Sequence, residues 1–213
     1  MRKQRFIILL FIAIFAAAAY VLGWSNVLTV SKVEITGTSK FISSSIIPGQ
    51  KLARIAPRVV ANSYEKLAWV RSARVSRNWL SGKVTITITE RVPIAIYNDL
   101  AIDKVGVSFP LSGPSIDNLV HIQASTVDSA IVAANFYSTL PGEFANEISI
   151  LIIKVDDSLV MQMHHGKNSV EVSWGQSGEN DLKVRVYSAL MQRPENIAIK
   201  RIDLSAPHAP IVK

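Results

Sequence analysis

The stretch VTITITERVPIAIY, from Val84 to Tyr97, alternates apolar and polar residues throughout its first half. Val84, Ile86 and Ile88 share one side of an extended chain, and the threonines between them share the other. This alternation predicts a β-strand with one buried side and one side open to solvent. Pro93 cannot donate a backbone hydrogen bond, so with the preceding Glu-Arg pair it predicts the passage from one unit to the next.

Toward the N-terminus, residues 27–91 predict the element order β-α-α-β-β, a short mixed sheet with two helices on one face. The predicted elements are a strand in LTVSKVEITG that ends at Gly37; a short helix capped by Ser43–Ser45 and stopped by Pro48-Gly49; a helix from Pro57 with Val60, Tyr64 and Leu67 on its buried face; a strand in WVRSARVS with Trp69, Ala73 and Val75 on one side, a pattern that Arg71 breaks; and a turn at Asn78–Gly82.

Toward the C-terminus, residues 92–213 predict a mixed α/β unit with an extended antiparallel sheet. The expected strands are Ile94–Tyr97, Val107–Phe109, Leu119–Gln123, Ile148–Val155, Leu159–His164, Ser169–Trp174 and Ile197–Leu204. The expected helices are one capped by Ser125 or Thr126, with Val127, Ala130, Ile131, Ala134 and Tyr137 on one face, and one capped by Ser177, with Leu182, Val186, Ala189 and Leu190 on one face.

The N-terminal segment Phe6–Trp24 contains 19 residues and no charge. As a helix it would be about 28 Å long, close to the thickness of a bilayer core. All nearby positive charge precedes it, so the N-terminus is predicted in the cytoplasm and the remaining chain outside. A cleaved signal peptide is the alternative, because Ala16–Ala19 offers small residues for cleavage.

The amino-acid composition excludes some kinds of chemistry and makes some partners unfavourable. The chain has 213 residues, a formal charge of +7 and no cysteine, which excludes disulfides and thiolate chemistry. From Ser25 onward, 20 Lys and Arg face 16 Asp and Glu. This mild excess argues against nucleic-acid binding and leaves room for a weak preference for anionic lipid or cell-wall polymer.

Few residues of the sequence are candidates for catalysis or metal binding. His164 and His165 would point to opposite faces of a strand, which disfavours a shared metal ion, and Asp156-Asp157 is typical of a turn. No nucleotide-binding or nucleophile motif is present, so we expect a non-enzyme without metal, cofactor or small-molecule substrate. A loose basic group is interpreted either as a solvated face or as a docking surface for a partner or lipid; it comprises Arg71, Arg74, Arg77 and Lys83.

An ordered set of residues resembles the FtsQ/DivIB family of bacterial cell division proteins. The set comprises Val33, Ile35 and Gly37; Trp69-Val70; Ala73, Val75, Arg77 and Trp79; Glu90-Arg91 with Pro93; Asp103, Gly106 and Phe109; and the segments VSWGQSGENDLKVRVYSAL and IDLSAPHAP. The resemblance covers essentially the whole chain. It implies a cytoplasmic tail at residues 1–5, a transmembrane helix at 6–24, a POTRA-like domain at 25–91, a β-rich domain at 92–204 and an extended tail at 205–213.

The resemblance also implies a function. It predicts a non-catalytic, single-pass scaffold at the division septum, with its C-terminal part outside the membrane. Its expected partners are FtsB/DivIC-like and FtsL-like single-pass proteins and, through them, the septal synthase complex. The open edges of small sheets accept strands from other chains. In the family the C-terminal strand region receives FtsB, which here implies Ile199, Lys200, Arg201, Ile202, Asp203 and Leu204.

Two other functions remain open at this level. A secreted POTRA-like binding module would arise if the N-terminal segment were cleaved. An extracytoplasmic cell-wall enzyme is the third hypothesis, although no set of residues in the sequence supports it.

Overall fold

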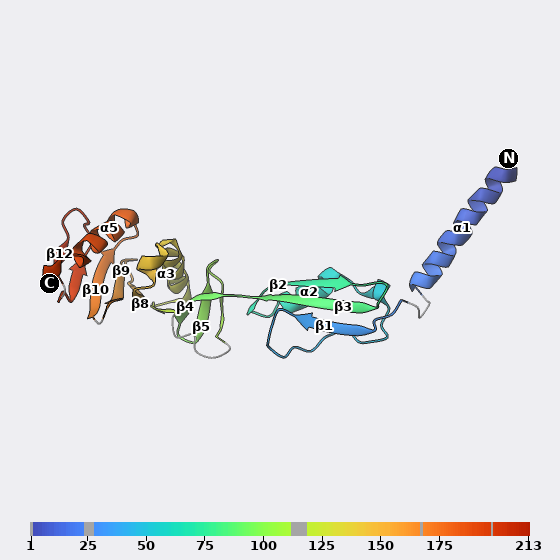
Figure 1. The fold of residues 1–213 in the computed structure, drawn as a ribbon, viewed down its shortest axis with the longest axis horizontal. Helices are drawn as coiled ribbons and strands as arrows, with labels where there is room; N and C mark the ends of the chain where they lie inside the picture. The colour runs from blue at the N-terminus through green and yellow to red at the C-terminus, as the bar shows by residue number, and fades with distance from the viewer. Residues whose placement is uncertain (1, 24–27, 112–118, 167, 197) are drawn as a thin grey trace. The chain divides into compact units, whose positions relative to one another are not determined.

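The computed structural model describes residues 2–23, 28–111, 119–166, 168–196 and 198–213 (Figure 1). The chain separates into two compact units, Met1–Arg91 and Val92–Lys213. The break falls between the last strand of the first unit and Pro93, where the sequence changes from the Thr/Ile alternation to the Glu-Arg-x-Pro motif.

The N-terminal segment is one helix, α1 (Arg2–Gly23). Its large apolar side chains are exposed, including Phe6, Leu9 and Phe15 at 71%, 64% and 73%. Among the residues that the structure describes, no helix meets the length and apolarity of a membrane span.

The first unit contains a three-stranded sheet in the order β1-β3-β2, with bounds β1 (Lys32–Thr36), β2 (Val70–Arg77) and β3 (Lys83–Glu90) (Figure 1). The central strand β3 lies parallel to β1 and antiparallel to β2. Its Val84, Ile86 and Ile88 are 0%, 0% and 2% exposed, whereas Thr87 and Thr89 are exposed. The predicted facing of the Thr/Ile stretch is therefore confirmed.

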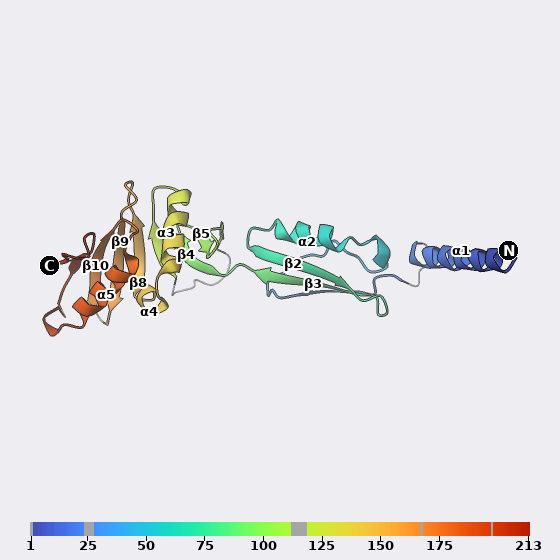
Figure 2. The ribbon, with the colours of Figure 1, turned by 90° about the horizontal axis from the view of Figure 1, so that it is seen from above.

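Helix α2 (Pro57–Glu65) covers the apolar face of this sheet (Figure 2). It begins at Pro57 as predicted, but it is short and its buried residues are Ala61 and Tyr64. The predicted face was therefore partly wrong, because Leu67 lies beyond the end of the helix and is 38% exposed.

The predicted helix after Ser43–Ser45 does not form. The Ser44 hydroxyl instead accepts a hydrogen bond from the Ile46 N–H (3.0 Å), a local turn that competes with helix. The chain then forms only a short 3₁₀ turn, η1 (Leu52–Arg54).

A bulge explains why Arg71 breaks the alternation in β2. The pairing with β3 shifts register between Val70 and Ser72, so one extra residue is inserted at this point. Val70, Ala73 and Val75 can then all lie in the core while Arg71 is exposed. At the same end of the sheet, on the β1 side, Gly37 has a φ of +85°, and a Cβ there would collide with the carbonyl oxygen of Ile88.

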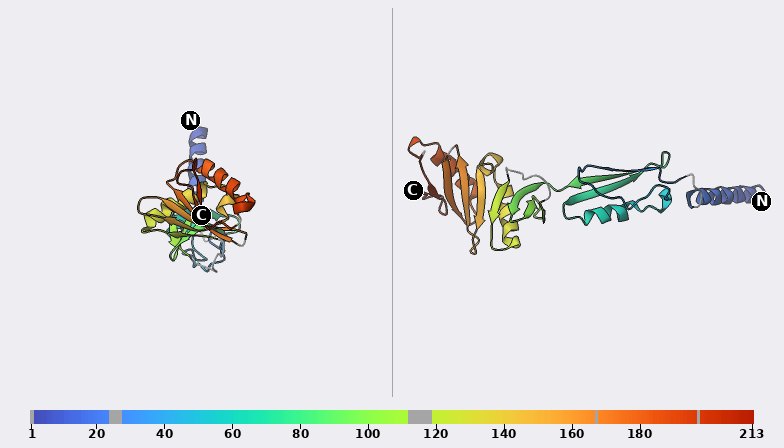
Figure 3. Two further views of the ribbon diagram at one scale, coloured as in Figure 1. Left: turned by 90° about the vertical axis from the view of Figure 1, so that its left-hand side faces the viewer. Right: turned by 90° about the horizontal axis from the view of Figure 1, so that it is seen from below.

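The second unit contains a nine-stranded mixed sheet in the order β12-β11-β10-β9-β8-β7-β4-β5-β6. Strands of this sheet, in the colours from green to red, are seen from two further sides in Figure 3. Its strands are β4 (Pro93–Tyr97), β5 (Leu100–Asp103), β6 (Ser108–Pro110), β7 (Val120–Gln123), β8 (Ile148–Ile153), β9 (Leu159–His165), β10 (Asn168–Gly175), β11 (Arg201–Asp203) and β12 (Ile211–Val212). Neighbours joined by short turns are antiparallel, whereas β7–β8 and β10–β11 are parallel because a helix connects each pair.

One face of this sheet is covered by helices α3 (Val127–Thr139) and α5 (Asn180–Met191), with the short α4 (Gly142–Ala145) and η2 (Pro194–Asn196). Thr126 caps α3 as predicted, accepting from the Ser129 N–H (3.1 Å). Trp174 is fully buried at the centre of the core, where Phe136, Phe144 and Tyr187 form an aromatic cluster with it. The α+β class is confirmed, with a large mixed sheet rather than an antiparallel one.

Several details of the second unit differ from the prediction. β5 and α4 were not predicted. Ser177 does not cap α5, which begins at Asn180 and fully buries Lys183 and Tyr187. Of the predicted apolar face, Val186 and Leu190 pack partly against the core. The last predicted strand is shorter, because only Arg201–Asp203 pairs as β11; Ile197 lies outside the described residues. The tail contains a further strand, β12, antiparallel to β11.

Candidate partner-binding surfaces

The residues predicted to bind a partner at the C-terminal strand fall into two groups. Ile202 and Leu204 are 0% exposed and belong to the core, and Ile199 packs partly against that core. Lys200 and Arg201 are exposed. Ile202 is thus buried rather than exposed, and the binding of a partner at this strand stays a prediction.

The predicted open edge at Ile197–Leu204 is also occupied. β11 pairs with β10 on one side and with β12 on the other. The Arg201 N–H donates to the Lys213 carbonyl (3.0 Å) and the Lys213 N–H donates back to Arg201 (2.9 Å). β12 is therefore the edge strand, and its Ile211 and Val212 are 55% and 39% exposed.

Arg201 and Asp203 line a groove of about 380 Å³ beside this edge. The other lining residues are Lys154, Glu171, Ser173, Ile211 and Lys213. Arg201 Nε lies 2.9 Å from Glu171 Oε1. The Asp203 carboxylate accepts from the Ser205 hydroxyl (2.6 Å) and N–H (2.9 Å), and these bonds hold the pKa of Asp203 below its usual value. The groove is thus lined by charged side chains of both signs, which these bonds hold in place, and by an exposed isoleucine.

The basic group predicted as a second docking surface is divided by the fold. The Arg77 guanidinium turns inward and donates to the carbonyls of Leu52 (2.9 Å) and Ile55 (2.7 Å). Lys83 forms an ion pair with Glu34 on the open face of the sheet, and its ammonium holds the pKa of Glu34 below the usual range. Arg71 and Arg74 are exposed.

A groove of about 720 Å³ follows the outer edge of β2, with α2 as one wall. Arg58, Ala61 and Glu65 line it from the helix, and residues 72–75 line it from the strand. Glu65 Oε1 accepts from the outward N–H of Ala73 (3.1 Å), so the helix satisfies one backbone donor at this edge.

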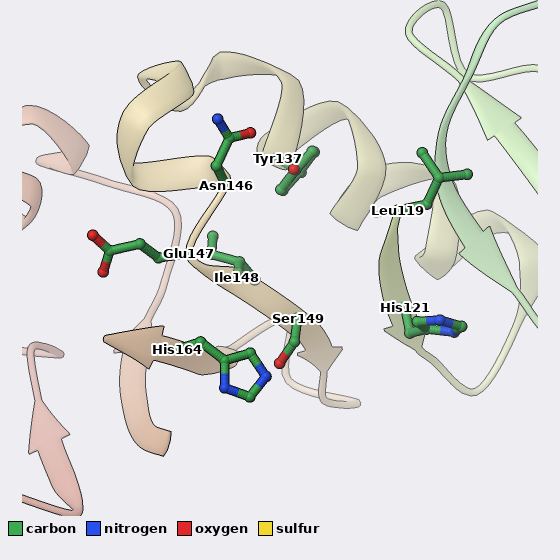
Figure 4. Close-up of a pocket in the computed structure, with 8 residues that line it drawn as sticks. All are labelled: Leu119, His121, Tyr137, Asn146, Glu147, Ile148, Ser149 and His164. Carbon is green, nitrogen blue, oxygen red and sulfur yellow. The ribbon is translucent and has the colours of Figure 1, made fainter. Parts of the chain in front are cut away.

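A third cavity, of about 490 Å³, is lined by Leu119, His121, Tyr137, Asn146, Glu147, Ile148, Ser149 and His164 (Figure 4). Two hydroxyl groups of this cavity are engaged in structural bonds. Ser149 Oγ donates to the Gln162 carbonyl (3.0 Å), and the Tyr137 hydroxyl donates to Ala145 (3.3 Å).

The histidines of this cavity do not assemble a site. His121 and His164 stand on different strands and apart from each other in Figure 4. Within the described ranges, no group of three acidic or histidine side chains is placed to hold a metal ion. The side chain of His165 lies outside the described residues. Asp156 occupies the turn after β8, where it accepts from the Ser158 hydroxyl (2.7 Å) and Asp157 has φ +60°.

Comparison with known proteins gives three findings. Residues 28–91 match the family model of the POTRA domain of the FtsQ type. The cell division protein FtsQ of Salinibacter ruber is 32% identical over 108 residues, which is 42% of this chain and 40% of that protein. The cell division protein FtsQ of Mycolicibacterium smegmatis is 25% identical over 224 residues, which is 97% of this chain and 65% of that protein. The matches cover less than two thirds of either relative.

These findings agree with the order of elements in the first unit. The matched range begins just before β1 and ends just after β3, so it contains the whole three-stranded sheet with α2. A POTRA domain is a binding module, which supports the prediction of a non-enzyme. Residues 28–91 thus match a POTRA domain of the FtsQ type, and the chain is similar to two bacterial cell division proteins named FtsQ.

Proposed function

We propose that this protein is a non-catalytic scaffold of the bacterial division machinery, which holds other division proteins outside the membrane. The observation that carries the proposal is the FtsQ-type POTRA match at residues 28–91, supported by a relative of that name that aligns with 97% of the chain. Such a scaffold would help to couple septal peptidoglycan synthesis to division. Its expected location is the cell membrane at the division septum.

The proposal includes a membrane anchor at α1. The support comes from the sequence, in which Phe6–Trp24 carries no charge and three cations precede it. The exposed apolar side chains along α1 would be covered by lipid in that arrangement. The N-terminus would then lie in the cytoplasm, and residues 25–213 outside it.

The proposed partner site is the edge at β12 rather than β11. A strand added outside Ile211–Val212 would extend the nine-stranded sheet through main-chain hydrogen bonds. The groove lined by Arg201 and Asp203 would accept polar side chains of that strand. FtsB/DivIC-like and FtsL-like single-pass proteins are the proposed occupants, and through them the septal synthase complex.

Site-specific photo-crosslinking in dividing cells tests this proposal. A photoreactive phenylalanine analogue replaces Ile211 in one strain and Val155, which is 93% exposed in the β8–β9 turn, in a matched control strain. The proposal predicts a cross-link from position 211 to a single-pass division protein, identified by mass spectrometry, and none from position 155. Equal cross-linking at both positions would refute the proposal that a partner binds at the β12 edge. Absence of a cross-link at position 211, in a protein that still complements division, would refute it as well.

A further inference from the structure

Charge is divided very unequally between the two units. Residues 28–91 contain eleven Lys and Arg but only three Asp and Glu, a net charge of +8. Residues 92–213 contain nine Lys and Arg and thirteen Asp and Glu, a net charge of −4. The positive charge that looks mild over the whole chain is therefore concentrated in the POTRA domain, which favours an anionic partner for that domain.

Exposed apolar side chains gather at one end of this domain. Leu80 and Trp79, in the turn between β2 and β3, are 101% and 38% exposed. Ile47, in the loop before η1, is 67% exposed. We call this the hairpin end, defined by residues 28–32, 47–54 and 78–83. The Leu80 side chain is not buried when the domain folds, so contact with an external apolar environment would be favourable.

Backbone hydrogen bonds fix the segments of the hairpin end together. The Ser31 N–H donates to the Gly82 carbonyl (2.9 Å), and the Ser31 hydroxyl donates to the Ser81 carbonyl (2.7 Å). On the other side, the Gly49 N–H donates to the Val30 carbonyl (2.8 Å). The Asn78 side chain accepts from the N–H groups of Leu80 and Ser81, both at 3.1 Å, which holds the turn.

Cations surround these apolar residues, while the acidic groups are engaged. Lys32 and Arg54 are exposed at this end, and the Arg77 guanidinium lies 5.0 Å from the centre of the Trp79 ring. Glu34 is paired with Lys83.

The other two carboxylates lie away from the hairpin end. Glu65 bonds to Ala73, and Glu90 accepts from Thr38 at the far end of β3 (2.5 Å). The hairpin end thus combines apolar anchors with an excess of positive charge, which is the chemistry that recognises an anionic bilayer surface.

We infer that the hairpin end docks on the anionic lipid surface of the membrane that holds α1, with Leu80 and Trp79 in the headgroup region. The chain length allows it. Gly23, the last residue of α1, and Ser31, which is bonded to the hairpin, have seven residues between them and are joined by eight Cα–Cα steps. An extended chain of that length spans at most about 28 Å. This inference rests on the proposed anchor, and docking would hold the POTRA domain close to the bilayer.

Spin labelling tests the inference directly, because the chain has no cysteine and single labels need no background removal. The full chain is reconstituted into vesicles of phosphatidylglycerol and phosphatidylcholine, with one label at Leu80→Cys, Phe15→Cys or Val155→Cys. Power saturation with oxygen and with a water-soluble nickel complex reports the depth of each label. Val155 is the exposed control in the second unit.

The inference predicts that the label at position 80 collides preferentially with oxygen, as expected in the headgroup region, whereas the label at 155 collides with nickel. Replacing Lys32 and Arg54 with glutamine, or using phosphatidylcholine alone, should make the label at 80 collide preferentially with the nickel complex. A label at 80 that is as aqueous as the label at 155 would overturn the inference. The label at position 15 reports separately on the anchor, since a nickel-accessible label there would refute the anchor itself.

Discussion

Replacing Lys183 with methionine tests how the second unit closes around its central tryptophan. Lys183 lies in α5 and is 3% exposed. Its ammonium donates to the carbonyls of Trp174 (2.8 Å) and Gln176 (2.9 Å), and it lies 5.5 Å from the centre of the Trp174 ring. Methionine preserves the apolar length of the side chain but cannot donate, so both carbonyls lose this donor.

The expected loss of stability follows from two opposing effects. A hydrogen bond from a charged group contributes about 1.5–3 kcal/mol, and a buried acceptor left without a donor costs a similar amount. Burial of the ammonium is itself unfavourable and lowers the pKa of Lys183, and the substitution removes that penalty. We expect a net decrease of about 2 kcal/mol in the free energy of unfolding of the second unit at pH 7.

The pH dependence has a defined sign. The pKa of Lys183 is lower in the folded protein than in the unfolded chain, where it is about 10.4. Between these two values the unfolded chain binds more protons, so the stability of the native protein rises with pH. The methionine variant lacks this contribution. The stability difference between the two proteins should therefore widen as the pH approaches about 10.4.

Hydrogen exchange measured by mass spectrometry on the full chain provides the assay. A loss of about 2 kcal/mol corresponds to roughly 30-fold faster exchange of the protected amides in β9 and β10. The amides of β2 and β3, in the other unit, are the internal control. Unchanged exchange in β10, or an equal increase in β3, would refute the assigned role of Lys183.

Ile86→Asp places a charge at a fully buried position in the first unit; it should cost more than about 4 kcal/mol and abolish protection in β2 and β3, and an unchanged melting profile would contradict the core assignment. Arg77→Met should destabilise the first unit by about 2 kcal/mol in urea unfolding, because the carbonyls of Leu52 and Ile55 lose the hydrogen bonds from the guanidinium. Arg74→Met, at an exposed position of the same strand, should change the stability by less than about 0.5 kcal/mol. Ile202→Asp should unfold the second unit rather than weaken an edge contact, and normal exchange protection in β10 would show that Ile202 is not in the core.

Local patterns predicted most of the secondary structure. The Thr/Ile alternation gave β3 with its buried side, and Pro57 and Thr126 marked the starts of α2 and α3. These features depend on neighbours in sequence, so one chain is sufficient to find them.

Features that depend on contacts between distant segments could not be predicted in the same way. Lys183 falls outside the apolar face that was predicted for its helix, yet its ammonium donates to carbonyls at the end of β10. The edge at β12 depends on residues 211–212 returning beside β11, which no pattern in a Pro-rich tail indicates. The concentration of charge in residues 28–91 was present in the sequence, and counting each unit separately would have revealed it.

Fluorescence imaging of an N-terminal fusion in dividing cells of the source organism tests the central claim most directly. A membrane-anchored division scaffold predicts a narrow band at the division site, with the fusion retained at full length in the membrane fraction. Even labelling along the whole membrane throughout the cell cycle would contradict the division role. Release of a shorter protein without the tag would contradict the anchor and favour a secreted POTRA module.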